Sequence, residues 1–292
     1  MKLPEDFILS MRSLLGNDSA QLFEALGSDA PVTIRLSPHK LKRNPLDFKV
    51  PVKPVPWSNW GYYLEDRPSF TFDPLFHAGY YYVQEASSMF VEQVVRQLVK
   101  EPAICLDLCG APGGKSVSLL SALPKGSLLV SNELIHQRAQ ILSETMTKFG
   151  DSASVVTNNH PRDFTLFPEL FDLILVDAPC SGEGMFRKDE VAIEEWSTQN
   201  VAMCAARQKD ILSDVWPSLK PGGVLVYSTC TFDREENMGT IERFLEKNTH
   251  FRIESARTGL APAELQTPEG AVASFPHRHL CEGSFAIALR KY

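Results

Sequence analysis

The sequence contains no apolar run that approaches the roughly 18 residues required for a membrane-spanning helix. It also lacks a leader in which basic residues precede an apolar stretch at the N-terminus. We therefore expect neither a membrane span nor a signal peptide, and we expect a cytoplasmic protein.

Cysteine and net positive charge are also scarce. Six cysteines in 292 residues form no dense framework, which is typical of reduced thiols in a reducing compartment. None has a CxxC or histidine partner at metal-ligand spacing, so we expect no metal site. The net charge of −7 excludes a general polyanion binder, but it leaves room for RNA binding through a local basic face.

The N-terminal part differs from the rest of the chain in composition. Two amphipathic helices are expected, over the first fifteen residues and near 18–27, followed by a strand at 32–36. A basic, proline-containing stretch comes next, with Arg35, Lys40, Lys42, Arg43, Lys49 and Lys53, and then the aromatic residues Tyr62, Tyr63, Phe70 and Phe72. Such a stretch can hold phosphates and stack on bases, but a solvated loop beside core aromatics explains it equally well. We predict a smaller N-terminal α+β RNA-binding domain over residues 1–78 and a larger catalytic domain over 79–292.

From about residue 85 the pattern alternates between helix and strand. Helices are expected at 85–100, from about 114, at 135–149 and at 197–216. Strands are expected at 103–108, 127–132, 152–156, 171–177, 223–228 and 285–291. This alternation, with 43% apolar residues in the chain, predicts an α/β fold with a mostly parallel, doubly wound, Rossmann-like sheet.

The turn after the first of these strands is rich in glycine, reading DLCGAPGGK over residues 107–115. Glycines there let the backbone approach a ligand closely, although a purely structural tight turn is an alternative. The spacing is not the GxGxxG of dinucleotide sites, and Pro112 lacks the N–H that a pyrophosphate would require, which disfavours a nicotinamide-dependent oxidoreductase. Glu133 ends the next strand, where a carboxylate can accept hydrogen bonds from both ribose hydroxyls. A nucleoside cofactor without pyrophosphate fits best, which suggests S-adenosylmethionine.

Two cysteines follow the strands expected at 171–177 and 223–228, namely Cys180 and Cys230. Ligands bind outside the carboxyl ends of such strands, so both thiols should reach one cleft. Methylation of cytosine at C5 needs a thiolate to add at C6, and Asp177 could hold or donate the proton at N3 if a closed pocket raises its pKa. A lone cysteine at a strand end is usually a small buried hydrophobe, but two in register beside an aspartate and a glycine loop favour chemistry. The spacing alone leaves open which thiol attacks.

Three motifs resemble those of the Sun-type (Nol/Nop/Sun) RNA cytosine-5 methyltransferases: CGAPGGK at 109–115, DAPCSGEGMFRK at 177–188 and YSTCTF at 227–232. The likeness covers roughly residues 80–292 and is greatest to the bacterial branch that acts on small-subunit rRNA. It implies that Cys230 is the nucleophile and that Cys180 promotes product release. It further implies S-adenosylmethionine as the cofactor, with contacts from Cys109, Gly110, Ala111, Pro112, Gly113, Gly114, Lys115, Glu133 and Asp177.

Two departures from the family pattern stand out. His160 occupies the place of an aspartate that contacts the adenine amino group, and a neutral imidazole nitrogen could accept that hydrogen bond instead. Bacterial relatives often continue into a C-terminal RNA-binding domain, whereas this sequence stops at Tyr292, as either a short form or a truncated one. The resulting prediction is an S-adenosylmethionine-dependent RNA cytosine-C5 methyltransferase, monomeric, that acts on small-subunit (16S) rRNA. The alternatives are a tRNA cytosine-C5 methyltransferase and a noncatalytic RNA-binding relative.

Overall fold

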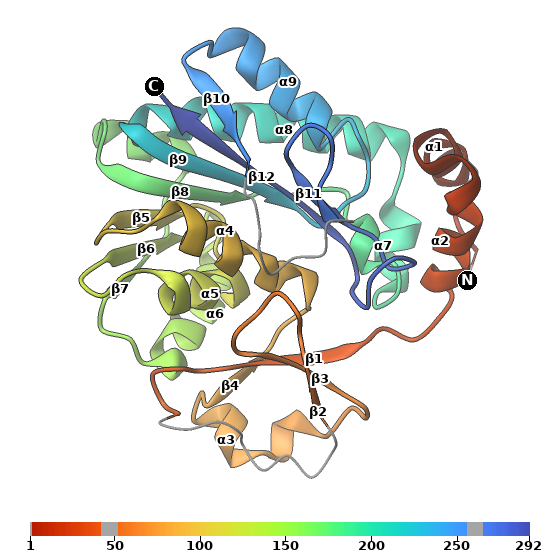
Figure 1. Cartoon of the computed structure of the whole chain (residues 1–292), viewed down its shortest axis with the longest axis horizontal. Helices are drawn as coiled ribbons and strands as arrows, with labels where there is room; N and C mark the ends of the chain where they lie inside the picture. The colour runs from red at the N-terminus through yellow and green to blue at the C-terminus, as the bar shows by residue number, and fades with distance from the viewer. Residues whose placement is uncertain (1, 42–51, 256–264) are drawn as a thin grey trace.

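The computed structural model describes residues 2–41, 52–255 and 265–292, and its main feature is a large mixed sheet (Figure 1). The strands of this sheet follow the order β10-β12-β9-β8-β5-β6-β7, and β11 pairs with β12. In chain order they are β5 (Ile104–Asp107), β6 (Leu128–Asn132), β7 (Ser154–Thr157), β8 (Phe171–Asp177), β9 (Leu219–Thr229), β10 (Phe251–Glu254), β11 (Val272–Ser274) and β12 (Ser284–Lys291).

The five strands from β5 to β9 run parallel to one another, which confirms the predicted Rossmann-like α/β fold. The closing strand β12 runs antiparallel to both β9 and β10. It does so because β12 pairs antiparallel with β11 just before it, so the chain returns without the crossover helix that a parallel strand would need.

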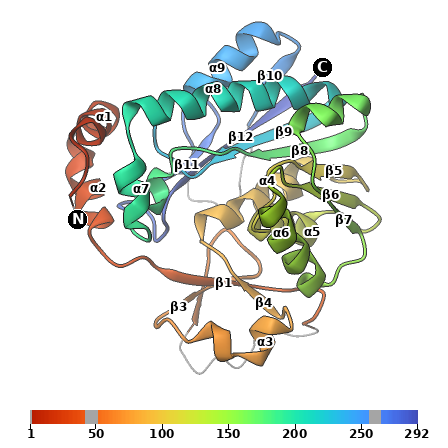
Figure 2. The same ribbon diagram turned by 180° about the vertical axis from the view of Figure 1, so that it is seen from behind.

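Helices cover both faces of the sheet, as the two opposite views show (Figures 1 and 2). One face carries α4 (Val91–Leu98), α5 (Gly114–Ala122) and α6 (His136–Phe149), and the other carries α8 (Thr198–Val215) and α9 (Met238–Lys247). Alternate residues of β8 pack against the two helical layers. Leu173 and Leu175 lie in the core with α4, α5 and α6, and Ile174 and Val176 lie in the core with α8 and α9. Burial on both faces explains why β8 reads as a continuous apolar run.

The N-terminal residues form two separate pieces (Figure 1). Helices α1 (Glu5–Leu15) and α2 (Ser19–Leu26) pack against the larger body near α7 (Glu190–Glu195), where Phe7 contacts Phe186 and Trp196 with ring centroids 5.1 and 5.6 Å apart. The second piece is a four-stranded antiparallel sheet with α3 (Pro74–His77) and the strand order β2-β3-β1-β4. Its strands are β1 (Val32–Leu36), β2 (Val52–Pro54), β3 (Gly61–Leu64) and β4 (Tyr81–Val83). The division of the chain after residue 78 stays a prediction.

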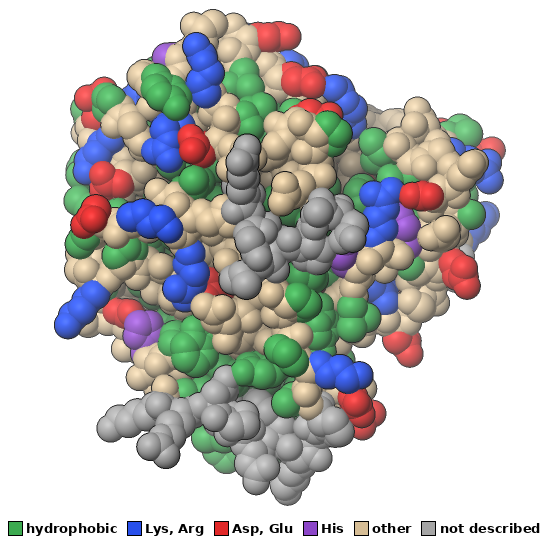
Figure 3. All heavy atoms as spheres, in the orientation of Figure 1, with side chains coloured by type: hydrophobic (Ala, Val, Ile, Leu, Met, Phe, Trp, Pro, Cys, Tyr) green, Lys and Arg blue, Asp and Glu red, His purple; other side chains and the backbone are tan. Residues whose placement is uncertain are grey.

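The predicted basic stretch is only partly described, since Lys42, Arg43 and Lys49 lie outside the described residues. Arg35 is buried and forms an ion pair with Glu92 of α4 at 2.6 Å. The Lys40 ammonium donates to the carbonyl groups of Ala78 and Lys148. On the face seen in Figure 3, described side chains of both charges lie interspersed. The described basic residues of this stretch therefore favour the structural alternative, because two of them tie the small sheet to the larger body.

Within the described ranges, no helix is long and apolar enough to cross a membrane.

Candidate active site

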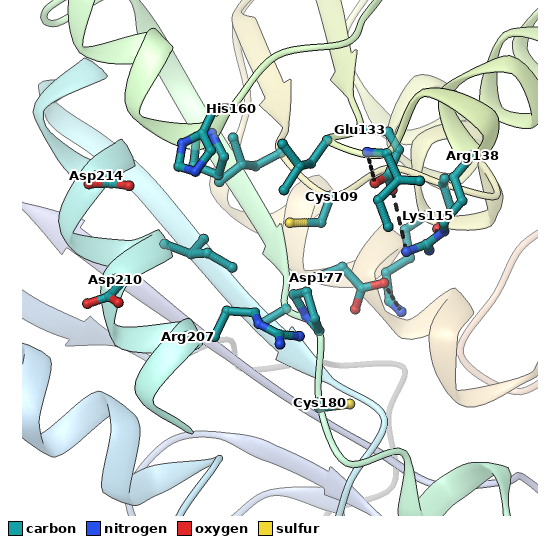
Figure 4. Close-up of a pocket in the computed structure, with 18 of the residues that line it drawn as sticks. Cys109, Lys115, Glu133, Arg138, His160, Asp177, Cys180, Arg207, Asp210 and Asp214 are labelled. Carbon is teal, nitrogen blue, oxygen red and sulfur yellow. Dashed lines mark hydrogen bonds and ion pairs between the residues drawn. The ribbon is translucent and has the colours of Figure 1, made fainter. Parts of the chain in front are cut away.

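A cavity of about 1090 Å³ opens at the carboxyl ends of β5, β6, β8 and β9 (Figure 4). Most of the side chains predicted from the sequence meet there: Cys109, Ala111, Lys115, Glu133, His160, Asp177, Cys180 and Cys230. The remaining predicted positions, Gly110, Pro112, Gly113 and Gly114, shape the turn beside the cavity and do not line it.

The glycine turn is held in place by β6 and α6. The Gly110 N–H donates to the carbonyl of Asn132 at 2.7 Å, and the Pro112 carbonyl accepts from the Thr145 hydroxyl at 2.7 Å. Gly113 has φ +115°, and a Cβ there would lie 2.6 Å from Cγ2 of Thr145. Only glycine fits this position, since both the backbone conformation and the close approach of α6 exclude a side chain.

Glu133 is prepared to accept hydrogen bonds from a ligand. Its side chain is 5% exposed, its Oε1 accepts from the N–H of Ile135 at 2.9 Å, and Nη1 of Arg138 lies 3.7 Å from its Oε2. The neighbouring Leu134 and Ile135 are 53% and 51% exposed and also line the cavity, which gives an apolar surface for a flat ring. A carboxylate beside such a surface suits a nucleoside: the ribose hydroxyls would donate to Glu133, and the nucleobase would pack on the apolar surface.

His160 lines the cavity (Figure 4). Its Nδ1 accepts from the N–H of Arg162 at 3.2 Å, as the cap of the short helix at Pro161–Leu166. A neutral ring with an accepting Nδ1 carries its proton on Nε2. To accept from an adenine amino group, the ring would have to release the Arg162 N–H, and this predicted interaction stays a prediction.

Asp177 ends β8 and has both carboxylate oxygens engaged. Its Oδ2 accepts from the Lys115 ammonium at 2.9 Å, and its Oδ1 accepts from the Ser228 hydroxyl at 2.8 Å. Burial lowers the pKa of Lys115, but the attraction and hydrogen bond of Asp177, together with nearby Cys230 and Asp107, raise it by more. The net result is a raised pKa of Lys115. Both oxygens of Asp177 thus accept hydrogen bonds in the structure, and its suggested part in holding or donating the N3 proton stays a prediction.

The two predicted thiols lie side by side. Strands β8 and β9 are adjacent and parallel, with Asp177 opposite Ser228, so the loops after them leave the sheet together. Sγ of Cys180 lies 3.3 Å from Sγ of Cys230. The hydroxyls of the next residues, Ser181 and Thr231, are 2.9 Å apart and join the two loops a second time.

The surroundings of the two thiols shift the pKa of each in opposite directions. The hydrogen bond from Cys180 lowers the pKa of Cys230, burial and Asp177 oppose this, and the nearby Lys115 ammonium adds to the lowering. The same hydrogen bond and burial raise the pKa of Cys180. The thiolate is therefore favoured at Cys230, with the shared proton on Cys180.

Helix α8 contributes cavity residues that the sequence reasoning missed, namely Arg207, Asp210 and Asp214 (Figure 4). Their spacing of three and four residues places them on one face of a helix. That periodicity was the available signal, but nothing in the sequence indicated that this face of α8 borders the cavity.

The remaining cysteines lie apart from the pair. Cys105, Cys204 and Cys281 are buried, and burial raises the pKa of each thiol. Across the described parts of the chain, no group of three histidine, cysteine or acidic side chains is arranged to hold a metal ion.

Asp107 at the end of β5 predicts an unusual pH dependence of stability. The residue is fully buried, its Oδ2 accepts from the Ser116 hydroxyl at 2.6 Å, and its Oδ1 has no hydrogen-bond partner among the described residues. Burial raises the pKa of Asp107 from 3.8 to about 7. Because the pKa is higher in the folded state, the stability contributed by this group is present below about pH 4 and is lost as the pH rises through about 7.

We expect Asp107→Asn to remove that loss, which amounts to at most about 4 kcal/mol. Urea unfolding at pH 5 and pH 8 measures it: the free energy of unfolding should fall more steeply with pH in the wild type than in the variant. Exposed Asp66 supplies the matched control, Asp66→Asn. An unchanged pH slope in Asp107→Asn would contradict the assignment.

Comparison with known proteins agrees with this geometry. A family model described as 16S rRNA methyltransferase RsmB/F matches residues 96–290, and a model for the N-terminal domain of 16S rRNA methyltransferase RsmF matches residues 3–86. The chain belongs to the RsmB/F family. The resemblance found in the three sequence motifs is thereby confirmed.

Two relatives of this RsmB/F chain are both named as small-subunit ribosomal RNA methyltransferases. Ribosomal RNA small subunit methyltransferase F of Pectobacterium atrosepticum is 32% identical over 304 residues, covering 99% of this chain and 63% of the relative. The protein of the same name from Vibrio campbellii is 36% identical over 248 residues, covering 82% and 52%. The chain thus spans less than two thirds of the length of these relatives.

Solved structures share the fold. A methyltransferase homolog protein from Pyrococcus horikoshii superposes with a TM-score of 0.81 at 26% identity, covering 99% of this chain and 95% of that one. NSun6 from the same organism, solved with SFG, superposes with a TM-score of 0.84 at 19% identity, covering 99% and 98%.

Proposed function

We propose that this RsmB/F chain is an S-adenosylmethionine-dependent methyltransferase that acts on C5 of cytosine in small-subunit ribosomal RNA. One observation carries the proposal: two thiols 3.3 Å apart open into the same cavity as a glycine turn and a carboxylate suited to a nucleoside. Family membership supports the substrate class, since the relatives are named as small-subunit rRNA methyltransferases.

The cofactor fits residues at one end of the cavity. Glu133 would accept from the ribose hydroxyls, and Leu134 and Ile135 would pack on the adenine. The turn at Cys109 and Ala111 would border the amino acid part of the cofactor. The bound cofactor supplies an electrophilic methyl group.

Cys230 is the nucleophile in this proposal. Its thiolate would add to C6 of cytosine while N3 takes a proton from water, and C5 of the resulting enamine would take the methyl group, leaving S-adenosylhomocysteine. Loss of the C5 proton to water, loss of the N3 proton and departure of the Cys230 thiolate then give 5-methylcytosine. The Lys115 ammonium and the Cys180 thiol favour the thiolate form of Cys230 both before addition and after departure.

Cys180 promotes release in this proposal. The family motif supports the role, and so does the geometry, because a thiol at 3.3 Å can donate a hydrogen bond to the departing sulfur. The cavity also borders Arg207 of α8, a group that can contact an RNA phosphate near the target base.

The substrate is tested by methyl transfer to purified RNA. Transfer to small-subunit rRNA, with 5-methylcytosine detected by bisulfite sequencing, is the expected result. Transfer to tRNA alone would support the tRNA alternative. Binding of RNA without transfer to either RNA would support the noncatalytic relative.

Cofactor binding gives a separate prediction. We expect S-adenosylhomocysteine to raise the melting temperature while NAD does not, since a ligand that binds only the folded state stabilises it. Glu133→Ala should weaken S-adenosylhomocysteine binding by at least about 100-fold in calorimetry, because two hydrogen bonds to a charged group are lost. The exposed Glu144 of α6 provides the control Glu144→Ala, which should bind normally. A shift with NAD alone, or normal binding by Glu133→Ala, would overturn the assignment.

A further inference from the structure

The buried carboxyl group of Glu236 contacts the loop that carries Cys180 and has no assigned part in cofactor binding, nucleophilic attack or release. Glu236 is 0% exposed and follows β9, the strand that leads to Cys230. Both of its carboxylate oxygens accept from the N–H of Ser181, at 3.0 and 3.3 Å. Its main chain is fixed as well, since the Tyr227 hydroxyl donates to the Glu236 carbonyl at 2.6 Å.

Glu236 acts together with Gln208 of α8, which is also fully buried. The side-chain amide of Gln208 donates to the Glu236 carboxylate at 2.8 Å and to the Pro179 carbonyl at 3.0 Å. The peptide groups on the two sides of Cys180 are therefore held by one pair of side chains. This clamp fixes the backbone from which the Cys180 thiol projects.

Among the described residues, the Glu236 carboxyl group is held by hydrogen bonds alone. In the described ranges no lysine or arginine forms an ion pair with Glu236, and burial raises its pKa. Burying a carboxylate without a cation destabilises a fold unless hydrogen bonds replace the lost water. Its carboxylate makes three hydrogen-bonding contacts, two with the Ser181 N–H and one with the Gln208 amide. All three therefore help to hold the loop that carries Cys180.

We propose that Glu236 is a positioning residue that holds the Cys180 thiol against the Cys230 sulfur for the release step. The inference rests on the proposed function, in which Cys180 serves release. In that step the C6–S bond breaks, its electron pair returns to the Cys230 sulfur, and the N3 proton leaves to water. Cys180 donates an S–H hydrogen bond to the departing thiolate and keeps its proton, which restores the contact between the two sulfurs seen in the structure.

The negative charge of Glu236 adds to this geometry. The hydrogen bond with Cys230 and burial raise the pKa of the Cys180 thiol, and the Glu236 carboxylate adds to this, so the proton stays on Cys180 when Cys230 leaves. A neutral amide of the same shape would lose the charge, and in either orientation its NH₂ group would face a donor: the Ser181 N–H alone, or that N–H and the Gln208 amide. Glu236→Gln should therefore disturb release while leaving methyl transfer by Cys230 intact.

The experiment uses the full chain with S-adenosylmethionine and small-subunit rRNA transcribed in vitro. For Glu236→Gln we expect single-turnover methyl transfer within about threefold of the wild type, and steady-state turnover at least about tenfold slower, the size of effect that misplacement of a reacting group produces. The protein–RNA adduct should accumulate on a denaturing gel. Exposed Glu235, adjacent in sequence, gives the matched control Glu235→Gln, which should behave as the wild type.

Two further variants keep the inference falsifiable. Gln208→Met removes the amide that holds the Pro179 carbonyl, and it should show the same release defect even if Glu236→Gln folds poorly. The double variant Cys180→Ala/Glu236→Gln should accumulate no more adduct than Cys180→Ala alone, because Glu236 acts through Cys180.

The inference is overturned if Glu236→Gln and Gln208→Met turn over normally, or if transfer and turnover fall by the same factor, as a structural defect would cause. It is also overturned if the double variant adds a further release defect. A wild-type protein that neither methylates the RNA nor forms an adduct would instead contradict the proposed function itself.

Discussion

Replacement of Cys230 by alanine is expected to lower methyl transfer to RNA by at least about 10⁴-fold, the scale of loss when a covalent nucleophile is removed. Without the thiolate, C5 of cytosine is too weak a nucleophile to take the methyl group. The variant should also form no covalent adduct with RNA. Single-turnover transfer of a radiolabelled methyl group, together with a denaturing gel, measures both effects.

The control for Cys230→Ala is the removal of a thiol outside the cavity. Cys204 lies buried on α8 and does not line the cavity, so Cys204→Ala should retain activity. S-adenosylhomocysteine should still raise the melting temperature of Cys230→Ala, which shows that the fold persists. Measurable turnover by Cys230→Ala would exclude it as the nucleophile.

Cys180→Ala is expected to leave the protein covalently attached to RNA. Methyl transfer should proceed once, since the Lys115 ammonium still favours the Cys230 thiolate, but the departing sulfur would lose the thiol that lies 3.3 Å away. Steady-state turnover should fall by at least about 100-fold, the size of effect that follows when one positioned hydrogen-bond donor to a developing anion is removed. The adduct is detected as a band of lower mobility that nuclease treatment removes.

The two cysteine variants also distinguish the opposite division of roles. If Cys180→Ala formed no adduct and transferred no methyl group while Cys230→Ala accumulated adduct, the nucleophile would be Cys180. If Cys180→Ala turned over normally without an adduct, the release role would be wrong.

The sequence predicted the core of the site because the relevant signals are local. Apolar runs at 171–177 and 223–228 indicated buried strands, and the chain places a cysteine just after each of them. In a parallel sheet the carboxyl ends of strands meet at one edge, so a cavity containing both Cys180 and Cys230 followed from pattern alone. The glycine turn was found for the same reason, since Gly113 marks a backbone conformation that other residues avoid.

Features that depend on contacts between distant segments could not be predicted. The tautomer of His160 is set by the backbone N–H of Arg162, which only the folded turn places beside the ring. Glu236 reads as one more acidic residue of a polar stretch, and its function as a clamp arises only when α8 and the Cys180 loop pack around it. The antiparallel closing strand was missed because an apolar run carries no information on direction.

The pairing of β8 with β9 has a consequence for how the chain tolerates changes of length. Phe171 pairs with Leu219 and Leu173 with Val224, so two steps along β8 correspond to five along β9. The extra residues of β9 form a bulge, called the excursion here, that includes the exposed Pro221 and Gly222. Regular pairing with β8 resumes at Val224. A short peptide or reporter inserted in the excursion would lengthen the chain without shifting the strand that follows, whereas one residue added between Val224 and Thr229 would turn Cys230 toward the opposite face. We therefore expect the chain to tolerate an insertion in the excursion, although only a few residues further on an insertion would displace the Cys230 thiol.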